Sequence, residues 1–257
     1  MIPEHEWLPQ AQRLAVGMRV RVRHRRESRA NMTIGNDRDR WWCYCQRCKE
    51  GGVVTKDHVL LTAPIEVVEH DLTVPSDLRP VIGSEFEDTV GRFLASKGMM
   101  FPYLPKLWYS QQARRLCLQD DQGGWHGRDL TGRSNAKWLH YAKPHLVGNV
   151  CRCTVLTEDI FSMYKVRFAL RHTPEIGTAT TLGAGCSTTA ALALKNCTTL
   201  VWAYDGDSAG DDGYKSGSKR MRALVPRQLR ARPPEGLDPK DMDCEDIREL
   251  LKGVIHA

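Results

Sequence analysis

The chain has 257 residues, of which 41% are hydrophobic, and this length suits one or two packed domains and excludes a small fold that depends on disulfides. Lys and Arg outnumber Asp and Glu by 37 to 31, and the resulting formal charge of +6 fits a polyanionic partner. The sequence contains no run of about 18 apolar residues, which excludes a membrane helix. The polar N-terminal segment and the nine cysteines predict a cytoplasmic chain with reduced thiols.

The first predicted element is a basic strand. Over 18–26, apolar residues alternate with arginines, and this period of two predicts a half-buried strand with a cationic outer face. A short strand over 31–34, a turn at 35–36 and an aromatic strand over 41–45 follow. This β ribbon has too few apolar residues for a core of its own, so we expect it to need a metal.

The middle of the chain begins with a proline-rich stretch. Three prolines and four acidic residues over 64–80 predict a linker rather than a regular element. Apolar residues at helical spacing over 85–99 predict an amphipathic helix that ends at Gly98. Short polar strands and turns rich in Gly and Arg are expected up to about Gly148.

Strands and helices alternate beyond residue 150. Strands are predicted over 153–156, 178–182, 199–204 and 228–232, and helices over 159–171, 188–195, 208–224 and 244–255. This alternation predicts an α/β fold with a mostly parallel sheet that helices cover on both faces.

Acidic residues follow two of these strands. Asp205 and Asp207 end the buried run over 200–204, and strand alternation aims both to one side if the backbone stays extended. Glu158 ends the strand over 153–157, and the carboxyl ends of parallel strands are where ligands gather. Clustered carboxylates need protons or cations, and oxygen ligands favour Mg²⁺ or Mn²⁺.

Two further acids, Asp238 and Asp241, follow the next predicted strand and offer ligands for a second metal. Two ions about 3.5 to 4 Å apart activate the attacking oxygen and neutralise the leaving one in phosphoryl transfer. Acids at strand ends also cap helices, so Asp207 or Ser208 is equally placed to cap the helix over 208–224.

The ordered series LTEDI over 156–160, YDGDSAG over 204–210 and LDPKD over 237–241 resembles the toprim domain of DNA primases. The resemblance is closest to the phage type, whose primase is in some cases fused to a replicative helicase, and it spans nearly everything from about Arg13 onward. It implies that Glu158, Asp205 and Asp207 bind catalytic divalent metals. It further implies that Asp238, with Asp241, completes the metal site.

Two cysteines after the aromatic strand have the form of a zinc knuckle. Two residues separate Cys45 from Cys48, and two glycines follow shortly after, a spacing that turns two thiolates onto one tetrahedral ion. The resemblance implies a second ligand pair upstream, where His24 stands in place but Arg26 occupies a position expected for cysteine.

The fourth zinc ligand is left open by the sequence. Cys43 restores four ligands together with His24, Cys45 and Cys48, while His58 or a water molecule is the alternative. A simpler interpretation of His24 is a histidine that pairs with a neighbouring acid on the basic strand.

The ribbon combines charge with aromatic rings. Its arginines are suited to neutralise phosphates, and Trp41, Trp42 and Tyr44 are suited to stack on unpaired bases. The resemblance implies that such a ribbon reads a short template sequence. The alternative is that the tryptophans pack beneath the ribbon.

A second basic motif lies in the middle of the chain. The run GRDLTGR over 127–133, followed by Ala136-Lys137-Trp138, resembles the basic motif that lines the template and nucleotide channel of primases. Arg128, Arg133 and Lys137 are the candidate contacts to nucleotide or template, although exposed basic residues are more often simply solvated.

The resemblance divides the chain into a zinc ribbon over 12–63, a linker over 64–80, a basic amino-terminal subdomain of the RNA polymerase domain over 81–149 and a toprim catalytic subdomain over 150–257. It implies a DNA primase that makes short RNA primers, with two Mg²⁺ or Mn²⁺ ions and a structural Zn²⁺. The expected partners are single-stranded DNA, NTPs and a helicase on a separate chain, without a membrane. A toprim nuclease and a non-catalytic, zinc-bearing helicase adaptor that binds single-stranded DNA are the alternatives.

Overall fold

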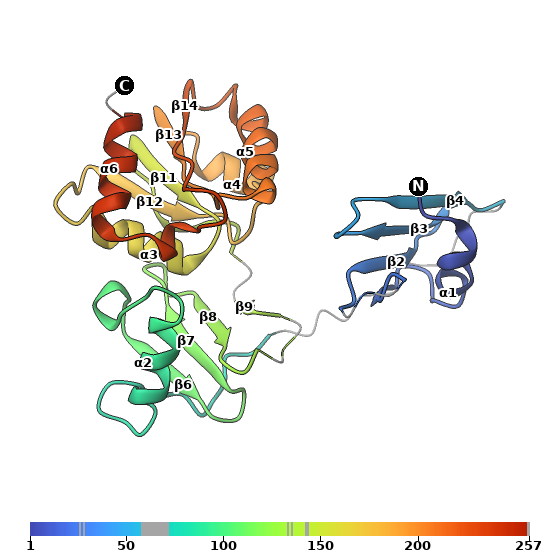
Figure 1. Cartoon of the computed structure of the whole chain (residues 1–257), viewed down its shortest axis with the longest axis horizontal. Coiled ribbons are helices and arrows are strands. Elements are labelled where there is room, and N and C mark those ends of the chain that lie inside the picture. The colour runs from blue at the N-terminus through green and yellow to red at the C-terminus, as the bar shows by residue number, and fades with distance from the viewer. Residues whose placement is uncertain are drawn as a thin grey trace. The chain divides into compact units, whose positions relative to one another are not determined.

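The computed structural model describes residues 1–25, 27, 29–57, 72–132, 134, 136–141 and 144–255 (Figure 1). Contacts divide the chain into two units, Met1–His70 and Asp71–Ala257. Within the described ranges, every helix is too short or too polar to cross a bilayer.

The first unit contains an antiparallel sheet in the order β1-β2-β3-β4. Its strands are β1 (Arg19–Val22), β2 (Met32–Asn36), β3 (Arg40–Cys45) and β4 (Gly51–Thr55). Before them come a 3-10 helix, η1 (Glu4–Glu6), and a short helix, α1 (Leu8–Gln12).

The N-terminal segment gives this sheet a core that the sequence did not predict. Ile2, Trp7 and Ala11 are buried against Met32 and Ile34 of β2. All three of these residues lie before the predicted zinc ribbon, which began at residue 12. The core of the first unit is therefore completed from outside the predicted ribbon, because a large apolar surface comes from Trp7, which lies outside the strands.

The predicted turn at 35–36 is also wrong. Gly35 and Asn36 end β2, and the chain turns over 37–39 instead. The Asn36 amide donates to the Leu14 carbonyl at 2.5 Å and its oxygen accepts from Lys56 Nζ at 2.6 Å, which keeps this residue in the sheet. A Cβ on Gly35 would lie 2.5 Å from the Trp42 ring, so the glycine permits the close approach of that indole.

The basic strand is less buried than its alternation predicts. Val20 and Met18 are 39% and 51% exposed, and only Val22 packs against the core of the unit. β1 is an edge strand, and an edge strand is covered by fewer neighbours than a central one.

The second unit begins with an antiparallel sheet in the order β5-β6-β7-β8-β9. It consists of β5 (Arg79–Pro80), β6 (Leu107–Ser110), β7 (Arg115–Gln119), β8 (Trp125–Asp129) and β9 (Trp138–His140), with α2 (Glu87–Ala95) and the 3-10 helix η2 (Phe101–Tyr103) between β5 and β6. The last two residues of the predicted linker over 64–80 thus pair with β6.

The helix predicted over 85–99 forms over a shorter range. α2 ends at Ala95, and Gly98 turns the chain with a φ of +63°. Its buried residues Val90 and Leu94 pack with Leu116 and Leu118 of β7, so the predicted apolar face does cover the sheet.

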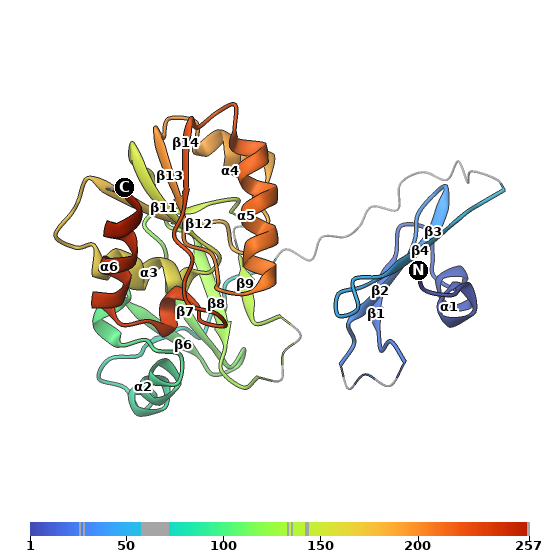
Figure 2. The same cartoon turned by 45° about the horizontal axis from the view of Figure 1, so that its top comes forward.

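The last part of the second unit is a mixed sheet in the order β10-β12-β11-β13-β14 (Figure 2). β10 (Val147–Asn149) runs antiparallel to β12 (Ile176–Thr180), whereas β11 (Cys153–Thr157), β12, β13 (Thr199–Trp202) and β14 (Arg227–Arg230) are parallel. The helices are α3 (Ile160–Ala169), α4 (Thr188–Ala193), α5 (Ser208–Met221) and α6 (Cys244–Ile255), with the 3-10 helix η3 (Pro239–Asp241).

Helices cover both faces of this sheet, as the alternating pattern predicts. Leu200 and Trp202 of β13 face α4 and α5, where Met221 is buried. Val201, between them, faces α3 and α6, where Leu251 is buried. The prediction of a mostly parallel sheet is confirmed for four strands, and β10 is the antiparallel exception.

Candidate carboxylate site and metal centre

The carboxyl ends of β11 and β13 bring two acids together. The strands are parallel neighbours with Leu156 opposite Trp202, so Glu158 and Asp205 leave the sheet at the same edge. The Asp205 N–H donates to Glu158 Oε1 at 3.3 Å. The structure therefore places this predicted pair in direct contact.

Burial makes both carboxylates difficult to ionise. Burial and then the neighbouring charge of Asp205 raise the pKa of Glu158 to about 7. Burial also raises the pKa of Asp205 to about 6, against the opposing charge of Lys240. In the described part of the chain, Asp205 Oδ1 is buried without a hydrogen-bond partner. Two hard oxygen donors whose negative charge Lys240 compensates only in part fit a divalent cation such as Mg²⁺.

Asp207 has a structural role as well as a place in the site. Its Oδ1 accepts from the Gly210 N–H at 2.8 Å and so caps α5. Of the two capping residues that the sequence offered, Asp207 rather than Ser208 is therefore the N-cap. The side chain is exposed, and its second oxygen has no hydrogen bond among the described residues. Capping therefore occupies half of the carboxylate and leaves the other half for a ligand.

Asp238 directly precedes η3, Asp241 is its last residue, and the two form a reciprocal capping box. Asp241 Oδ2 accepts from the Asp238 N–H at 3.2 Å in a capping box. Between them, Lys240 contacts the Asp238 carboxylate and donates to Asp159 Oδ2 at 3.0 Å. A lysine of the chain itself thus neutralises part of the acidic edge.

The five predicted acids do not form a compact ligand set. Across the described ranges, the one group of at least three His, Cys, Asp or Glu ligand atoms within 4.8 Å of one another is His24, Cys45 and Cys48. The acids share one edge of the sheet, but three of their oxygens are not within that distance. A divalent ion would have to draw them closer together.

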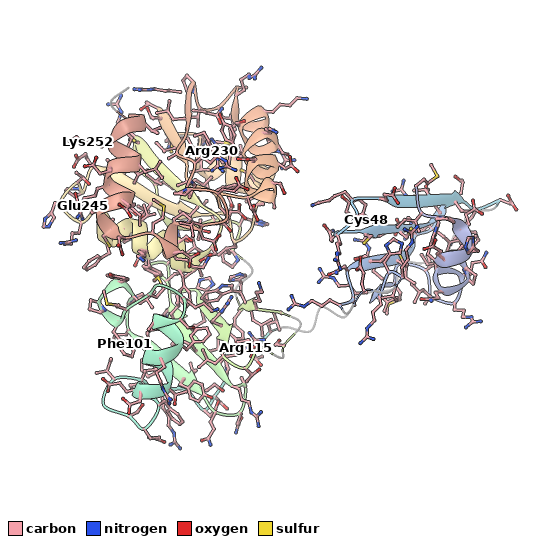
Figure 3. The ribbon with its side chains drawn as sticks, in the orientation of Figure 1. Cys48, Phe101, Arg115, Arg230, Glu245 and Lys252 are labelled. Atoms are coloured by element: carbon pink, nitrogen blue, oxygen red, sulfur yellow. The ribbon has the colours of Figure 1, made fainter. Side chains whose placement is uncertain are left out.

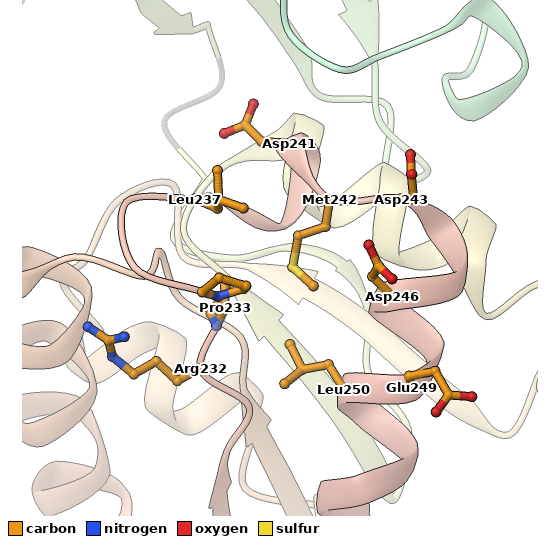
Figure 4. Close-up of a pocket in the computed structure, with 10 residues that line it drawn as sticks. Arg232, Pro233, Leu237, Asp241, Met242, Asp243, Asp246, Glu249 and Leu250 are labelled. Atoms are coloured by element: carbon orange, nitrogen blue, oxygen red, sulfur yellow. The ribbon is translucent and has the colours of Figure 1, made fainter.

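A cavity of about 650 Å³ lies beside η3 (Figure 4). Asp241 lines it together with Arg232 and three acids on or before α6: Asp243, Asp246 and Glu249. Neither Glu158 nor Asp205 lines this cavity, so it is separate from the carboxylate pair.

Lys165 holds the site together, and the sequence did not identify it. Its buried Nζ donates to the carbonyls of Gly98 and Lys240, both at 2.7 Å. Burial lowers the pKa of Lys165, and nearby acids oppose this shift. The contacts fix the turn at Gly98 and η3 against α3, across 67 and 75 residues of sequence respectively, and no local pattern reveals such separations.

The basic motif lies on β8 and the loop after it. The Arg128 guanidinium lies over the rings of Phe93 and Trp138, at 5.9 and 5.5 Å, and its Nε is buried without a partner among the described residues. Burial lowers the pKa of Arg128, whereas the charge of Asp159 raises it, so Arg128 lies in the field of the acidic edge. Lys137 is exposed, and Arg133 lies outside the described residues.

A buried arginine orders this loop. Arg115 donates to the Gly127 carbonyl at 3.1 Å, to Ser134 Oγ at 2.8 Å and to the Ala136 carbonyl at 3.0 Å (Figure 3). Asp129 accepts from the backbone and hydroxyl of Thr131, at 3.1 and 2.8 Å. The loop is thus held by a side chain from the interior of the sheet. Nothing in the sequence showed that Arg115 differs from the exposed arginines.

The predicted zinc residues meet in the first unit. His24 Nδ1 is 3.6 Å from Cys48 Sγ, and Cys45 completes the group of three ligand atoms. His24 Nε2 is 3.2 Å from Glu6 Oε2. A carboxylate that accepts from one imidazole nitrogen leaves the other free to bind a metal, so the donor set fits Zn²⁺.

Cys43 does not join this group, so the structure brings together three of the four predicted ligands. Cys43 and Cys45 share a face of β3, but residues on one face are about 6.5 Å apart, and only Cys45 adjoins the turn that carries Cys48. Burial raises the pKa of Cys43 to about 11 and also raises the pKa of Cys48. His58 lies outside the described residues, and Glu27 Oε1 is 3.9 Å from Cys45 Sγ.

The aromatic residues of the ribbon have different surroundings. Trp41 packs against the core of the first unit with Lys56 over its ring at 4.9 Å, and Arg19 lies over Trp42 at 5.3 Å. Tyr44 is 37% exposed. Packing therefore explains Trp41, whereas Tyr44 is accessible for stacking.

Without metal, the stability of the protein is expected to fall as the pH rises from roughly 4 to 7. The pKa values of Glu158 and Asp205 are raised to about 7 and about 6 in the folded protein. Their contribution to the stability of the folded state is therefore complete at pH values below the pKa values of the unfolded chain, and it is lost as the pH rises through the folded-state values. Mg²⁺ should therefore raise the melting temperature more at pH 8 than at pH 5. Thermal scans with and without Mg²⁺ measure this, and equal shifts at both pH values would contradict it.

The chain matches no family model and no curated protein. Among solved structures, it is similar to the Aquifex aeolicus primase (zinc-binding and RNA polymerase domains), with 16% identity over 96% of this chain and 82% of that one and a TM-score of 0.47. It is also similar to the primase fragment of the bacteriophage T7 primase-helicase protein, with 15% identity over 85% and 94% and a TM-score of 0.45.

A DNA primase domain from Pseudomonas aeruginosa is 16% identical, over 57% of this chain, with a TM-score of 0.44. The chain spans about half of that domain, 53% of its length. Likeness at these identities and TM-scores assigns no activity to the chain.

Proposed function

We propose that the protein is a phage-type DNA primase, which synthesises short RNA primers on a single-stranded DNA template. The observation that carries the proposal is the contact of Glu158 with Asp205 at the ends of adjacent parallel strands, with an unpartnered buried oxygen and raised pKa values. Acids in this state bind divalent cations, and the series of motifs in which they occur resembles the toprim domain of primases.

In the proposed reaction, the primer 3′ hydroxyl attacks the α-phosphate of an NTP and pyrophosphate leaves. Two bound Mg²⁺ or Mn²⁺ ions would activate the hydroxyl and stabilise the charge on the phosphates. Glu158, Asp205 and Asp207 would hold these ions with Asp238 and Asp241. Lys240 would balance the charge of the acids, because it already contacts Asp159 and Asp238.

The zinc-bearing unit is proposed to recognise the template. His24, Cys45 and Cys48 would hold structural Zn²⁺, with the fourth position open. Exposed Arg19 and Arg21 on β1 would contact phosphates, and Tyr44 would stack on a base. We further propose that a helicase on a separate chain delivers the template, in the cytoplasm of a host cell.

The test of the proposed function is the incorporation of labelled NTPs on single-stranded DNA of random sequence with Mg²⁺ or Mn²⁺. Short RNA products that depend on both template and metal are expected. Cleavage of the DNA would favour the nuclease alternative. Binding without synthesis, even after addition of the cognate helicase, would favour the adaptor.

Replacement of Arg128 by alanine is expected to raise the KM for NTPs by about tenfold, the size of one charge-assisted phosphate contact. Arg128 lies in the field of Asp159 with its Nε unpartnered among the described residues, so it is placed to meet a phosphate near the acids. Steady-state kinetics measure this change. Arg92→Ala, an exposed arginine on α2, is the matched control, and equal effects of both variants would contradict the assignment.

A further inference from the structure

A second cavity, of about 400 Å³, lies between β9 and the segment that joins β12 to α4. We call it the β9 cavity, and its lining includes Trp138, His140, His145, Thr181, Leu182 and Ser187. This volume is in the range of small-molecule sites, and its mixture of rings, aliphatic groups and a few polar atoms is typical of them.

The β9 cavity adjoins the carboxylate pair through its wall. The Thr181 N–H donates to the Thr157 carbonyl at 3.3 Å, and Thr181 Oγ1 is 2.7 Å from the Tyr204 hydroxyl. Thr157 and Tyr204 are the residues directly before Glu158 and Asp205. The inner wall of the cavity is therefore tied to the ends of the two strands that precede the acids.

A buried hydrogen-bond chain ends at the cavity. Asp120 Oδ2 is 2.8 Å from His126 Nε2, and His126 Nδ1 is 2.8 Å from His140 Nδ1. Asp120 Oδ1 accepts two backbone N–H groups, from Gln122 and Gly124, both at 2.8 Å. His126 is fully buried, and Asp120 is 7% exposed.

This chain fixes the tautomer of His140. A carboxylate can only accept, and Asp120 Oδ1 accepts from two backbone N–H groups while Oδ2 meets His126, so His126 carries its proton on Nε2. Burial lowers the pKa of His126, so the ring is neutral and its Nδ1 is an acceptor. His140 Nδ1 must then be the donor. Because burial lowers the pKa of His140 to about 4, its Nε2 is a bare acceptor.

Nε2 of His140 has no protein partner among the described residues, on a side chain that lines the cavity. Its surroundings are flat and aromatic: Trp138 lies nearly parallel to the His140 ring, at an interplanar angle of 14°. A complementary ligand is a planar ring with an N–H donor on its edge, and every nucleobase has both features.

We propose that the β9 cavity binds a nucleobase, whose N–H group donates to Nε2 of His140 while its ring lies among Trp138 and Leu182. The ligand class rests on the proposed function, whereas the direction of the hydrogen bond comes from the chain of Asp120, His126 and His140. Asp120 and His126 are positioning residues, because they act on the ligand only through His140. The base belongs either to an NTP or to a template nucleotide.

Nitrogen NMR of ¹⁵N-histidine-labelled protein tests the proposal without any variant. The Nδ1–H tautomer is expected for His140 and the Nε2–H tautomer for His126. Each NTP, added without divalent metal, should shift the His140 Nε2 resonance, and ribose 5-phosphate should not. Oligodeoxythymidylate and its abasic analogue form the template arm. An Nε2–H tautomer at His140, or no response to any base, would overturn the proposal.

His140→Phe keeps a ring in place and removes the acceptor. Nucleotide binding should weaken by about tenfold, the effect of an unpaired donor in a buried contact. His172→Phe, an exposed histidine outside the cavity lining, is the matched control and should bind normally. Equal affinities of wild type and His140→Phe would refute the contact, and the tautomer measurement still decides the matter if this variant does not fold.

The two proposals fail separately. Base-dependent shifts at His140 in a protein that makes no primers would refute the proposed function and retain the nucleobase site. Primer synthesis by a protein whose His140 responds to neither NTPs nor oligonucleotides would do the reverse.

Discussion

Replacement of Asp205 by asparagine is expected to reduce primer synthesis by at least about a thousandfold. The change removes a charged ligand of the proposed metal ions, which stabilise the negative charge that develops on the phosphate in the transition state. The new amide side chain would keep the size and the contact surface of the carboxylate that it replaces. The Asp205 N–H to Glu158 hydrogen bond is made by the backbone and survives the change. Binding of single-stranded DNA should therefore remain normal.

The same variant should become more stable without metal at pH 8. Asp205 has a raised pKa of about 6, so its ionised form opposes folding above that pH, and asparagine removes this charge. The stabilisation by Mg²⁺ should disappear at the same time. Primer synthesis and thermal scans with and without Mg²⁺ measure the two effects.

The matched control is Asp212→Asn, an exposed aspartate on α5. It should retain both synthesis and the response to Mg²⁺. A variant at Asp205 that keeps substantial synthesis would contradict the metal-ligand role. A variant that loses synthesis but melts at a lower temperature than wild type would indicate a structural role instead.

Cys45→Ser is expected to abolish stoichiometric zinc binding and to unfold the first unit. Cys45 is fully buried in the group with His24 and Cys48, and structural zinc contributes on the order of 10 kcal/mol to the folding of small domains. The second unit has its own cores and should keep its thermal transition. Metal analysis of the purified protein and circular dichroism with a chelator measure both effects.

Cys43→Ala is the control that the structure itself supplies. Cys43 shares the face of β3 with Cys45 but is not in the ligand group, so this variant should keep its zinc and lose only a little core packing. Loss of zinc from Cys43→Ala would restore the four-residue set predicted from the sequence. Zinc retention by Cys45→Ser would refute the centre.

The arrangement of the C-terminal half was predictable because local patterns carry it. The alternation of apolar runs with helical spacing over 150–257 predicts the parallel strands and their helices, and acids placed directly after strands must lie at one edge of the sheet. Glu158 and Asp205 could therefore be paired from the sequence alone. The antiparallel strand β10 could not, because three residues carry too little pattern to give a direction.

The sequence only partly predicted which residues belong to the group of His24, Cys45 and Cys48. The spacing of Cys45 and Cys48 indicates a knuckle by itself. The exclusion of Cys43 and the support of His24 by Glu6 depend on how β3 and η1 pack, since the His24 and Glu6 atoms meet across 18 residues. The core of this unit depends in the same way on Trp7, which no strand pattern includes.

Local sequence patterns were enough to indicate which acids follow strands, which cysteines have knuckle spacing and which half of the chain forms a mostly parallel α/β sheet. The groups that interact over long sequence separations became visible only in the folded chain. Lys165 joins Gly98 to Lys240, and the Asp120 chain reaches the β9 cavity through two histidines on neighbouring strands. Periodicity records which way a side chain faces within its own element, whereas proton positions and ligand groups depend on distances between elements.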